Sequence, residues 1–232
     1  MSTIVFFCIP AYGHTNPTLG VVRELAAQGH KVVYYSYDTM RKPIEAAGAA
    51  FVSCNAYDAE QRLSPKDGER LGRDLAFSTK VLVDTTLALD GAILSDMRAL
   101  APDCIVADSM AIWGRLIAQK LGIPFVSSTT TFAFNRYSAK IMKQSPSQLL
   151  RMLASMPKIG REIKRLQAAG YPVKNVLDII QNDENTDTIV YTSPEFQPCA
   201  ETFSPAHYAF VGPSIRPAEK TMGKPGQPLV YV

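Results

Sequence analysis

The side chains in this sequence best suited to chemistry are one histidine and one aspartate, His14 and Asp108. An imidazole held by a carboxylate can act as a general base. The carboxylate fixes the tautomer and stabilises the imidazolium that forms when the other ring nitrogen takes a proton. Each residue also has an ordinary interpretation, a solvated or capping histidine and an aspartate that caps the next helix. Acid–base chemistry is therefore predicted only if the fold brings the two together.

The segments around these residues alternate between strand-like and helix-like patterns, which predicts an α/β fold with a Rossmann-like parallel sheet flanked by helices. The apolar run 4–9 is typical of a central strand that is buried on both faces. Further strands are expected at 31–36, 50–53, 104–107, 125–128, 188–192 and 208–212.

Helices are expected between these strands. The first is predicted to begin near Pro17, with Asn16 as its cap, and to end at Gly29. The others are expected at 39–47, at 69–100 with a break near 90–91, at 111–121, and over much of 132–183 with breaks at Pro146, Pro157 and Pro172.

His14 is expected in the loop after the first strand, and Asp108 follows the fourth strand. If the strand order is the common 3-2-1-4-5, these two strands are neighbours where the order reverses. Ligands of open α/β sheets bind in the crevice at that point, beside the carboxyl ends of the strands. The two side chains are then expected to project into one crevice. His30, His207 and Asp103 fall elsewhere and are expected to have structural or solvent roles.

Other residues at the same edge of the sheet complete the predicted site. Gly13 is expected to allow a tight turn, and Thr15, Asn16 and Ser109 flank the two chemical residues on the same loops. The strand at 125–128 runs into Thr129, Thr130 and Phe132, and hydroxyls beside an aromatic ring suit a pocket for a flat, partly polar small molecule. For each single aromatic, ordinary core packing is the alternative.

Several classes of protein are disfavoured by missing motifs. The loop at 10–17 has neither the GxGxxG fingerprint nor a P-loop, so a dinucleotide or nucleoside-triphosphate site is not expected here. Without a GxSxG elbow or a glycine-rich cofactor loop, a hydrolase or a methyltransferase is a weaker hypothesis. A net charge of +3 gives no reason to expect nucleic acid.

The composition, 47% hydrophobic and 19% charged, is that of a soluble globular protein. No apolar run approaches the roughly 18 residues that cross a bilayer, and the N-terminus does not resemble a signal peptide. Four widely spaced cysteines, Cys8, Cys54, Cys104 and Cys199, form no CxxC pair, so a reduced cytoplasmic protein is expected. Nine basic residues and one acid in 136–174 are interpreted as a solvated helix surface, rather than as a contact for an anionic membrane surface or an acidic partner.

The end of the chain indicates a domain boundary. Residues 1–212 are predicted to form one domain. Residues 213–228 contain four prolines and two glycines and are predicted to be an interdomain linker. Residues 229–232 then resemble the first strand of a further domain.

Three segments carry a resemblance to a known family: AYGHTNP, PDCIVADSMAIWGRLIAQKLGIPFVSSTTTFAFN and the closing LVYV. Together they resemble family-1 glycosyltransferases of the GT-B fold, above all the bacterial macrolide-type UDP-glycosyltransferases, over nearly the whole chain. The resemblance implies that this chain is the N-terminal, acceptor-binding half of a GT-B fold, with His14 on the family's general base and Asp108 on its partner.

The resemblance also implies the reaction. A hydroxyl of a macrolide-, phenolic- or flavonoid-like small molecule displaces UDP from a UDP-sugar such as UDP-glucose, with inversion at the anomeric carbon and without a metal. The sugar nucleotide is held mainly by a C-terminal donor-binding domain that is missing here, so the isolated chain is expected to be inactive. The alternative is a standalone acceptor-binding subunit of a split glycosyltransferase that needs a separate donor-binding chain.

Overall fold

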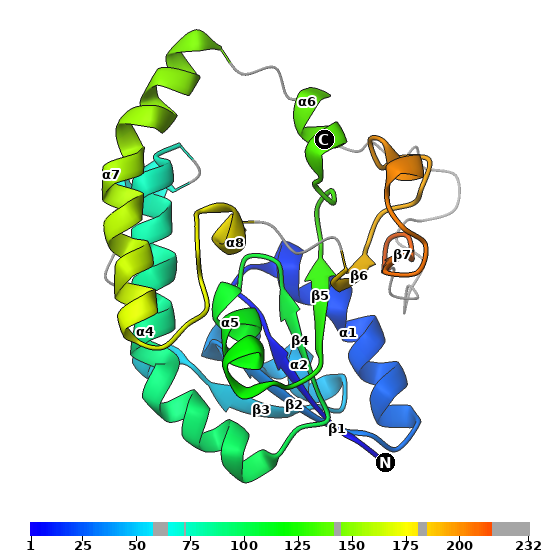
Figure 1. Cartoon of the computed structure of the whole chain (residues 1–232). Helices are drawn as coiled ribbons and strands as arrows, with labels where there is room; N and C mark the ends of the chain where they lie inside the picture. The colour runs from blue at the N-terminus through cyan, green and yellow to red at the C-terminus, as the bar shows by residue number, and fades with distance from the viewer. Residues whose placement is uncertain (58–64, 72, 142–144, 181–184, 215–232) are drawn as a thin grey trace, which may run out of the picture.

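The structure is a computed structural model that describes residues 1–57, 65–71, 73–141, 145–180 and 185–214 (Figure 1). In it, one parallel sheet has the strand order β3-β2-β1-β4-β5-β6-β7. The strands are β1 (Thr3–Phe7), β2 (Lys31–Ser36), β3 (Ala50–Ser53), β4 (Cys104–Asp108), β5 (Phe125–Thr129), β6 (Asp187–Val190) and β7 (Tyr208–Phe210). The predicted α/β fold and the order 3-2-1-4-5 are both confirmed, and two strands extend the sheet beyond β5.

Helices cover both faces of this sheet, as a parallel sheet requires. They are α1 (Tyr12–Ala27), α2 (Arg41–Ala46), α3 (Pro65–Arg70), α4 (Leu75–Leu100), α5 (Ile112–Leu121), α6 (Arg136–Ile141), α7 (Pro146–Ala168) and α8 (Leu177–Ile180). Figure 1 shows α1 on one side of the sheet and α4, with α7 outside it, on the other. Among the described helices, none is both long and apolar enough to cross a membrane.

Side chains alternate along each strand between two cores. On one face, residues such as Val5, Phe7 and Ile105 pack against α4 and α5. On the other face, Phe6 and Val106 pack with α1 and α2. Because this alternation has a period of two residues, it also decides which helix each strand-end side chain meets.

Gly114 sets the distance between α5 and the central strands. A Cβ at this position would lie 2.5 Å from the Cβ of Ala107 and 3.0 Å from Cδ2 of Phe7. Only a residue without a side chain therefore lets α5 approach β1 and β4 this closely. Ala107, the residue that such a Cβ would meet, directly precedes Asp108.

The predicted start of the first helix was wrong. α1 begins at Tyr12 rather than at Pro17, and its N-cap is Ala11 rather than Asn16. Pro17 therefore lies inside the helix, where its missing N–H leaves the carbonyl of Gly13 without its usual partner. Gly13 is exposed, so water can satisfy that carbonyl. The end was predicted correctly, since Gly29 follows α1 with a left-handed φ of 82°.

Two predicted helix breaks were also wrong. α4 continues through residues 90–91, where the carboxylate of Asp90 is tied to Lys120 of α5 (Nζ–Oδ1 3.0 Å) and to the Tyr171 hydroxyl. α7 likewise continues through Pro157, whereas Pro146 is its first residue and fits that position without strain. Tertiary contacts thus accompany a continuous α4 at a place where local propensity favours a break.

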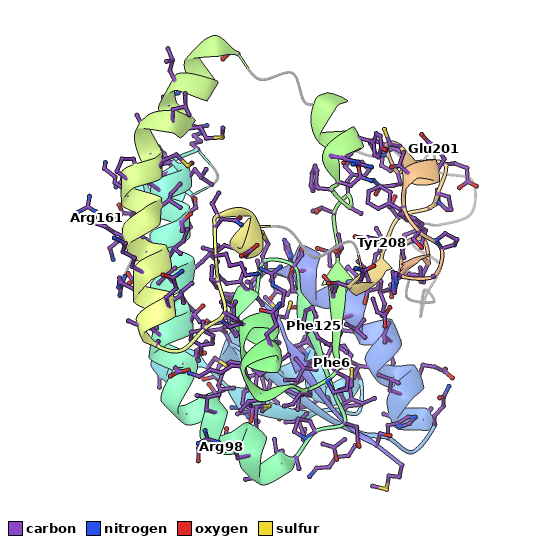
Figure 2. The ribbon with its side chains drawn as sticks, in the orientation of Figure 1. Phe6, Arg98, Phe125, Arg161, Glu201 and Tyr208 are labelled. Atoms are coloured by element: carbon purple, nitrogen blue, oxygen red, sulfur yellow. The ribbon has the colours of Figure 1, made fainter. Side chains whose placement is uncertain are left out.

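The basic residues of 136–174 with described side chains are exposed, and Figure 2 shows Arg161 projecting from the outer side of α7. Arg165 pairs with Asp84 of α4 at 2.7 Å and with Glu162 at 2.5 Å. A solvated surface, the favoured interpretation of this stretch, agrees with these exposures. None of the four cysteines, all of them within the described residues, forms a disulfide. Most of the predicted linker, and all of 229–232, lie outside the described residues.

Candidate active site

The candidate site lies at the carboxyl ends of β1 and β4, where the strand order reverses. β1 pairs with β2 on one side and with β4 on the other. The connection from β3 to β4 therefore passes β2 and β1, and the strand order reverses between β1 and β4. His14 is the third residue of α1, not a loop residue as predicted. The first turn of that helix therefore holds the imidazole over the end of the sheet.

Strand register explains why Asp108 faces this helix. Phe6 pairs with Val106 across β1 and β4, and both belong to the core beneath α1. Two residues further along, Cys8 and Asp108 point the same way because strand side chains alternate. The carboxylate of Asp108 therefore lies between the sheet and α1, close to the His14 imidazole in the first turn of that helix.

The two side chains are in contact. Nδ1 of His14 lies 2.5 Å from Oδ2 of Asp108. The His14 side chain is 20% exposed, whereas that of Asp108 is fully buried. The other oxygen of Asp108, Oδ1, accepts from the backbone N–H of Met110 at 2.8 Å and from the Ser109 hydroxyl at 3.4 Å. Asp108 is not a helix cap, because α5 begins at Ile112 and its N-cap is Ala111.

This arrangement sets the tautomer and the basicity of His14. With Nδ1–H donating to the carboxylate, the lone pair of the neutral ring is on Nε2. Nε2 makes no hydrogen bond to any residue within the described ranges. The hydrogen bond to Asp108 raises the pKa of His14 above its ordinary value, burial opposes this, and the negative charge of Asp108 adds to the increase. The ring is therefore a partly exposed base whose protonated form is stabilised.

The structure brings some of the other predicted residues to this pair. Oγ1 of Thr130 lies 3.1 Å from Nδ1 of His14, and Ser109 contacts Asp108 as described. Thr15 is buried and lies behind the pair, with Oγ1 3.6 Å from Sγ of Cys8. These residues come from the ends of β4 and β5 and from α1.

Other predicted residues have different surroundings. Gly13 has helical backbone, so the expected tight turn is wrong. Thr129 is buried and contributes its backbone carbonyl to the N–H of Tyr191. The ring of Phe132 packs against that of Phe196, with centroids 5.4 Å apart.

Sequence reasoning overlooked two groups near the pair. Cys8 was interpreted as a small hydrophobe, yet its Sγ lies 3.7 Å from Oδ2 of Asp108. Tyr34 of β2 lies in the same core, and its hydroxyl is 2.8 Å from Oγ1 of Thr18. The period of two along β1 could have identified Cys8, because it places residue 8 on the face of residue 6.

The remaining candidates lie away from this site. Asp103 accepts from the backbone N–H of Thr3 at 2.7 Å, and His30 accepts from that of Ser2 at 3.2 Å. Both contacts are at the amino ends of the strands. His207 contacts Asp187 at 2.9 Å, beside the start of β6.

We predict that Asp108→Asn lowers the pKa of His14 to its ordinary value of about 6.5 or below. The reason is that both effects of the carboxylate, the hydrogen bond and the charge, raise this pKa, whereas the remaining effect, burial, lowers it. The measurement is an NMR titration of the three histidine rings.

The raised pKa of His14 in the folded state also has a consequence for stability. The His14–Asp108 pair stabilises the fold fully below about pH 6.5, and this contribution is lost as the pH rises through the folded-state pKa of His14.

Asp187→Asn is the matched control, because it removes the carboxylate from the other His–Asp contact within the described residues. It should leave the titration of His14 unchanged. An unaltered His14 titration in Asp108→Asn would show that the carboxylate does not control the base.

Comparison with known proteins gives a consistent set of relatives. The chain is 32% identical over 247 residues to the demethyllactenocin mycarosyltransferase of Streptomyces fradiae, covering 100% of this chain and 52% of the relative. It is 29% identical over 222 residues to the uncharacterised UDP-glucosyltransferase YdhE of Bacillus subtilis (strain 168), covering 95% of this chain and 54% of the relative. The chain thus spans about half the length of the curated relatives it matches.

A solved structure agrees with these relatives. The calicheamicin glycosyltransferase CalG4 is 27% identical, with a TM-score of 0.68, over 95% of this chain and 54% of that protein. No protein-family model matches the chain.

Proposed function

We propose that this chain, which matches in sequence and fold the N-terminal half of family-1 glycosyltransferases of the GT-B fold, is the acceptor-binding half of an inverting enzyme. The enzyme would transfer a sugar from a UDP-sugar to a hydroxyl of a small, largely apolar acceptor. The observation that carries the proposal is the contact between His14 and Asp108 at the switch point of the sheet. This contact fixes the imidazole through Nδ1 and leaves Nε2 available to a substrate.

The proposed step is a direct displacement. Nε2 of His14 takes the proton of the acceptor hydroxyl while that oxygen forms a bond to the anomeric carbon. The bond between this carbon and the UDP oxygen breaks, and UDP leaves with the electron pair. Asp108 stabilises the resulting imidazolium and keeps Nδ1 protonated throughout. Attack from the face opposite the leaving group inverts the anomeric configuration.

Exposed apolar side chains at the same edge support an apolar acceptor. Tyr12 is 63% exposed, Met110 47% and Phe134 48%. They follow β1, β4 and β5, the three strands whose carboxyl ends surround His14. Exposed apolar groups at the same edge of a sheet as a catalytic candidate support a binding surface there. The relative from Streptomyces fradiae, whose name gives demethyllactenocin as its acceptor, agrees with a macrolide-like substrate.

The donor is the second part of the proposal. The Bacillus subtilis relative is named a UDP-glucosyltransferase, which supports a UDP-sugar. The first turn of α1 presents backbone N–H groups. A helix N-terminus attracts anions, so this one can stabilise the diphosphate of a donor that another domain holds there. The residues that bind the nucleotide itself would belong to the half that the relatives possess beyond this match.

The test is an assay of the longer protein that carries this chain together with a donor-binding half. UDP-glucose, whose glucose is α-linked, is offered with a panel of hydroxylated macrolides, phenols and flavonoids, and TDP-glucose is offered in parallel. The expected product is a β-glucoside, identified by mass spectrometry and by NMR of its anomeric proton. An α-glucoside, or hydrolysis of UDP-glucose without glycoside, would overturn the proposed mechanism.

A further inference from the structure

A buried group of polar side chains lies behind the candidate base, between the sheet and α1. It consists of Cys8 from β1's end, Thr15 and Thr18 from α1, Tyr34 from β2, and Asp108 from β4. Each member is at least nine-tenths buried. Polar groups at such depth must find partners within the protein, because water cannot reach them. Their hydrogen bonds therefore reveal what the group does.

Cys8 is the member of this group that joins Asp108. Its Sγ lies 3.7 Å from Oδ2, the same oxygen that accepts from His14, and 3.6 Å from Oγ1 of Thr15. A carboxylate cannot donate, so the contact with Asp108 requires the thiol proton to point at Oδ2. The Thr15 hydroxyl then donates to the sulfur, which completes a chain from Thr15 through Cys8 to Asp108.

The thiol keeps its proton under ordinary conditions. Burial, and after it the negative charge of Asp108, raise the pKa of Cys8 well above its usual value. Burial also raises the pKa of Tyr34, and raises that of Tyr191 to about 12. These are the titratable groups that face Asp108 from β1, β2 and the segment after β6, and all three are neutral. Oδ2 of Asp108 is therefore shared between two donors, His14 and Cys8, while Oδ1 accepts from Met110 and Ser109.

We propose that Cys8 is a positioning residue for the base: its S–H holds Oδ2 of Asp108 and limits how strongly that carboxylate stabilises protonated His14. The thiol and the imidazole compete for one oxygen. Removing the thiol proton donor leaves the carboxylate a stronger acceptor for His14, so the imidazolium becomes more stable. With Cys8 in place, a larger fraction of His14 is neutral near pH 7 and able to take a proton. This role deepens the proposed function, but its first test does not depend on that function.

The test compares two substitutions in the 232-residue chain, with the pKa of His14 measured by NMR. Cys8→Val keeps the apolar volume and removes the donor, whereas Cys8→Ser keeps a donor and reduces the apolar character. We expect Cys8→Val to raise the pKa of His14 by about half a unit, the size of a weak hydrogen bond. Cys8→Ser should leave it close to the wild-type value. A thiol that only fills space predicts no change in either variant, and that result would overturn the proposal.

Cys54→Val is the matched control, since Cys54 is another buried cysteine outside any disulfide, in the core on the opposite face of the sheet. It should not alter the His14 titration. Thr15→Val provides a second variant at the other end of the chain of hydrogen bonds, and it should shift the His14 pKa in the same direction as Cys8→Val, by less. In the longer enzyme, the acidic limb of kcat/KM should move to higher pH in Cys8→Val. If Cys8→Val raises the His14 pKa but the longer enzyme has no transferase activity, the role of Cys8 stands and only the proposed function is contradicted.

Discussion

Replacing His14 with alanine in the complete enzyme is expected to slow turnover by a factor of roughly 10²–10⁴, the usual contribution of a general base. The acceptor hydroxyl would then have to give its proton to water as the bond to the sugar forms. The exposed apolar side chains Tyr12, Met110 and Phe134 would be untouched. The loss should therefore appear in kcat, measured by the rate of UDP release, while the affinity for the acceptor changes little.

His207→Ala is the control, because His207 also contacts a carboxylate but lies beside the start of β6. It should retain wild-type turnover. Asp108→Ala should reduce turnover by less than His14→Ala, since the base remains and loses only its orientation and charge partner. Wild-type turnover in His14→Ala would overturn the proposed mechanism, although not the fold.

The 232-residue chain on its own is expected to give no glycoside above background when it is mixed with UDP-glucose and an acceptor. Its candidate base is intact, but the proposed donor-binding residues belong to a second half. Fixing two reactants in a productive geometry is worth an effective concentration of about 10⁵–10⁸ M, and this advantage disappears when one reactant is not held. The measurement is product detection by liquid chromatography with mass spectrometry, beside the longer protein as the positive reference.

Binding of the acceptor separates loss of the donor site from simple misfolding. Adding an acceptor to the isolated chain should shift the NMR signals of the His14 ring and leave those of His30 unchanged, because His30 lies at the amino ends of the strands. A clear product peak from the isolated chain would contradict the prediction, and it would mean that the donor can be positioned without a second half.

The sheet was the most predictable part of the molecule. The strands at 31–36 and 50–53 were predicted with the bounds they have in the structure. Apolar, β-branched runs between glycine-ended helices leave few alternatives for strands that are buried on both faces. Helix boundaries were less predictable. Pro17 is typical of a first helical turn, but here the exposed carbonyl of Gly13 tolerates a proline further inside α1.

The site was predictable as far as strand order determines it. Residues at the ends of two neighbouring strands must meet, so His14 and Asp108 could be paired across 94 residues of sequence. Cys8 could not be distinguished from a core residue by type alone, because its role depends on a distance to Asp108. The role of Gly114 could not be predicted either, because a glycine inside a helix does not indicate how closely that helix approaches the sheet.

The pairing of β1 with β4 also has a consequence for how the protein forms on the ribosome. Chains emerge from the N-terminus onward, so β1, β2 and β3 are available to one another well before β4 is synthesised. During that interval one edge of β1 has no neighbour, and His14 has no carboxylate beside it. The step that pairs β4 with β1 creates the His14–Asp108 contact, so the pKa of His14 reports whether these two strands have joined. A newly made chain in which His14 titrates with its ordinary pKa is one in which β4 has not yet paired with β1.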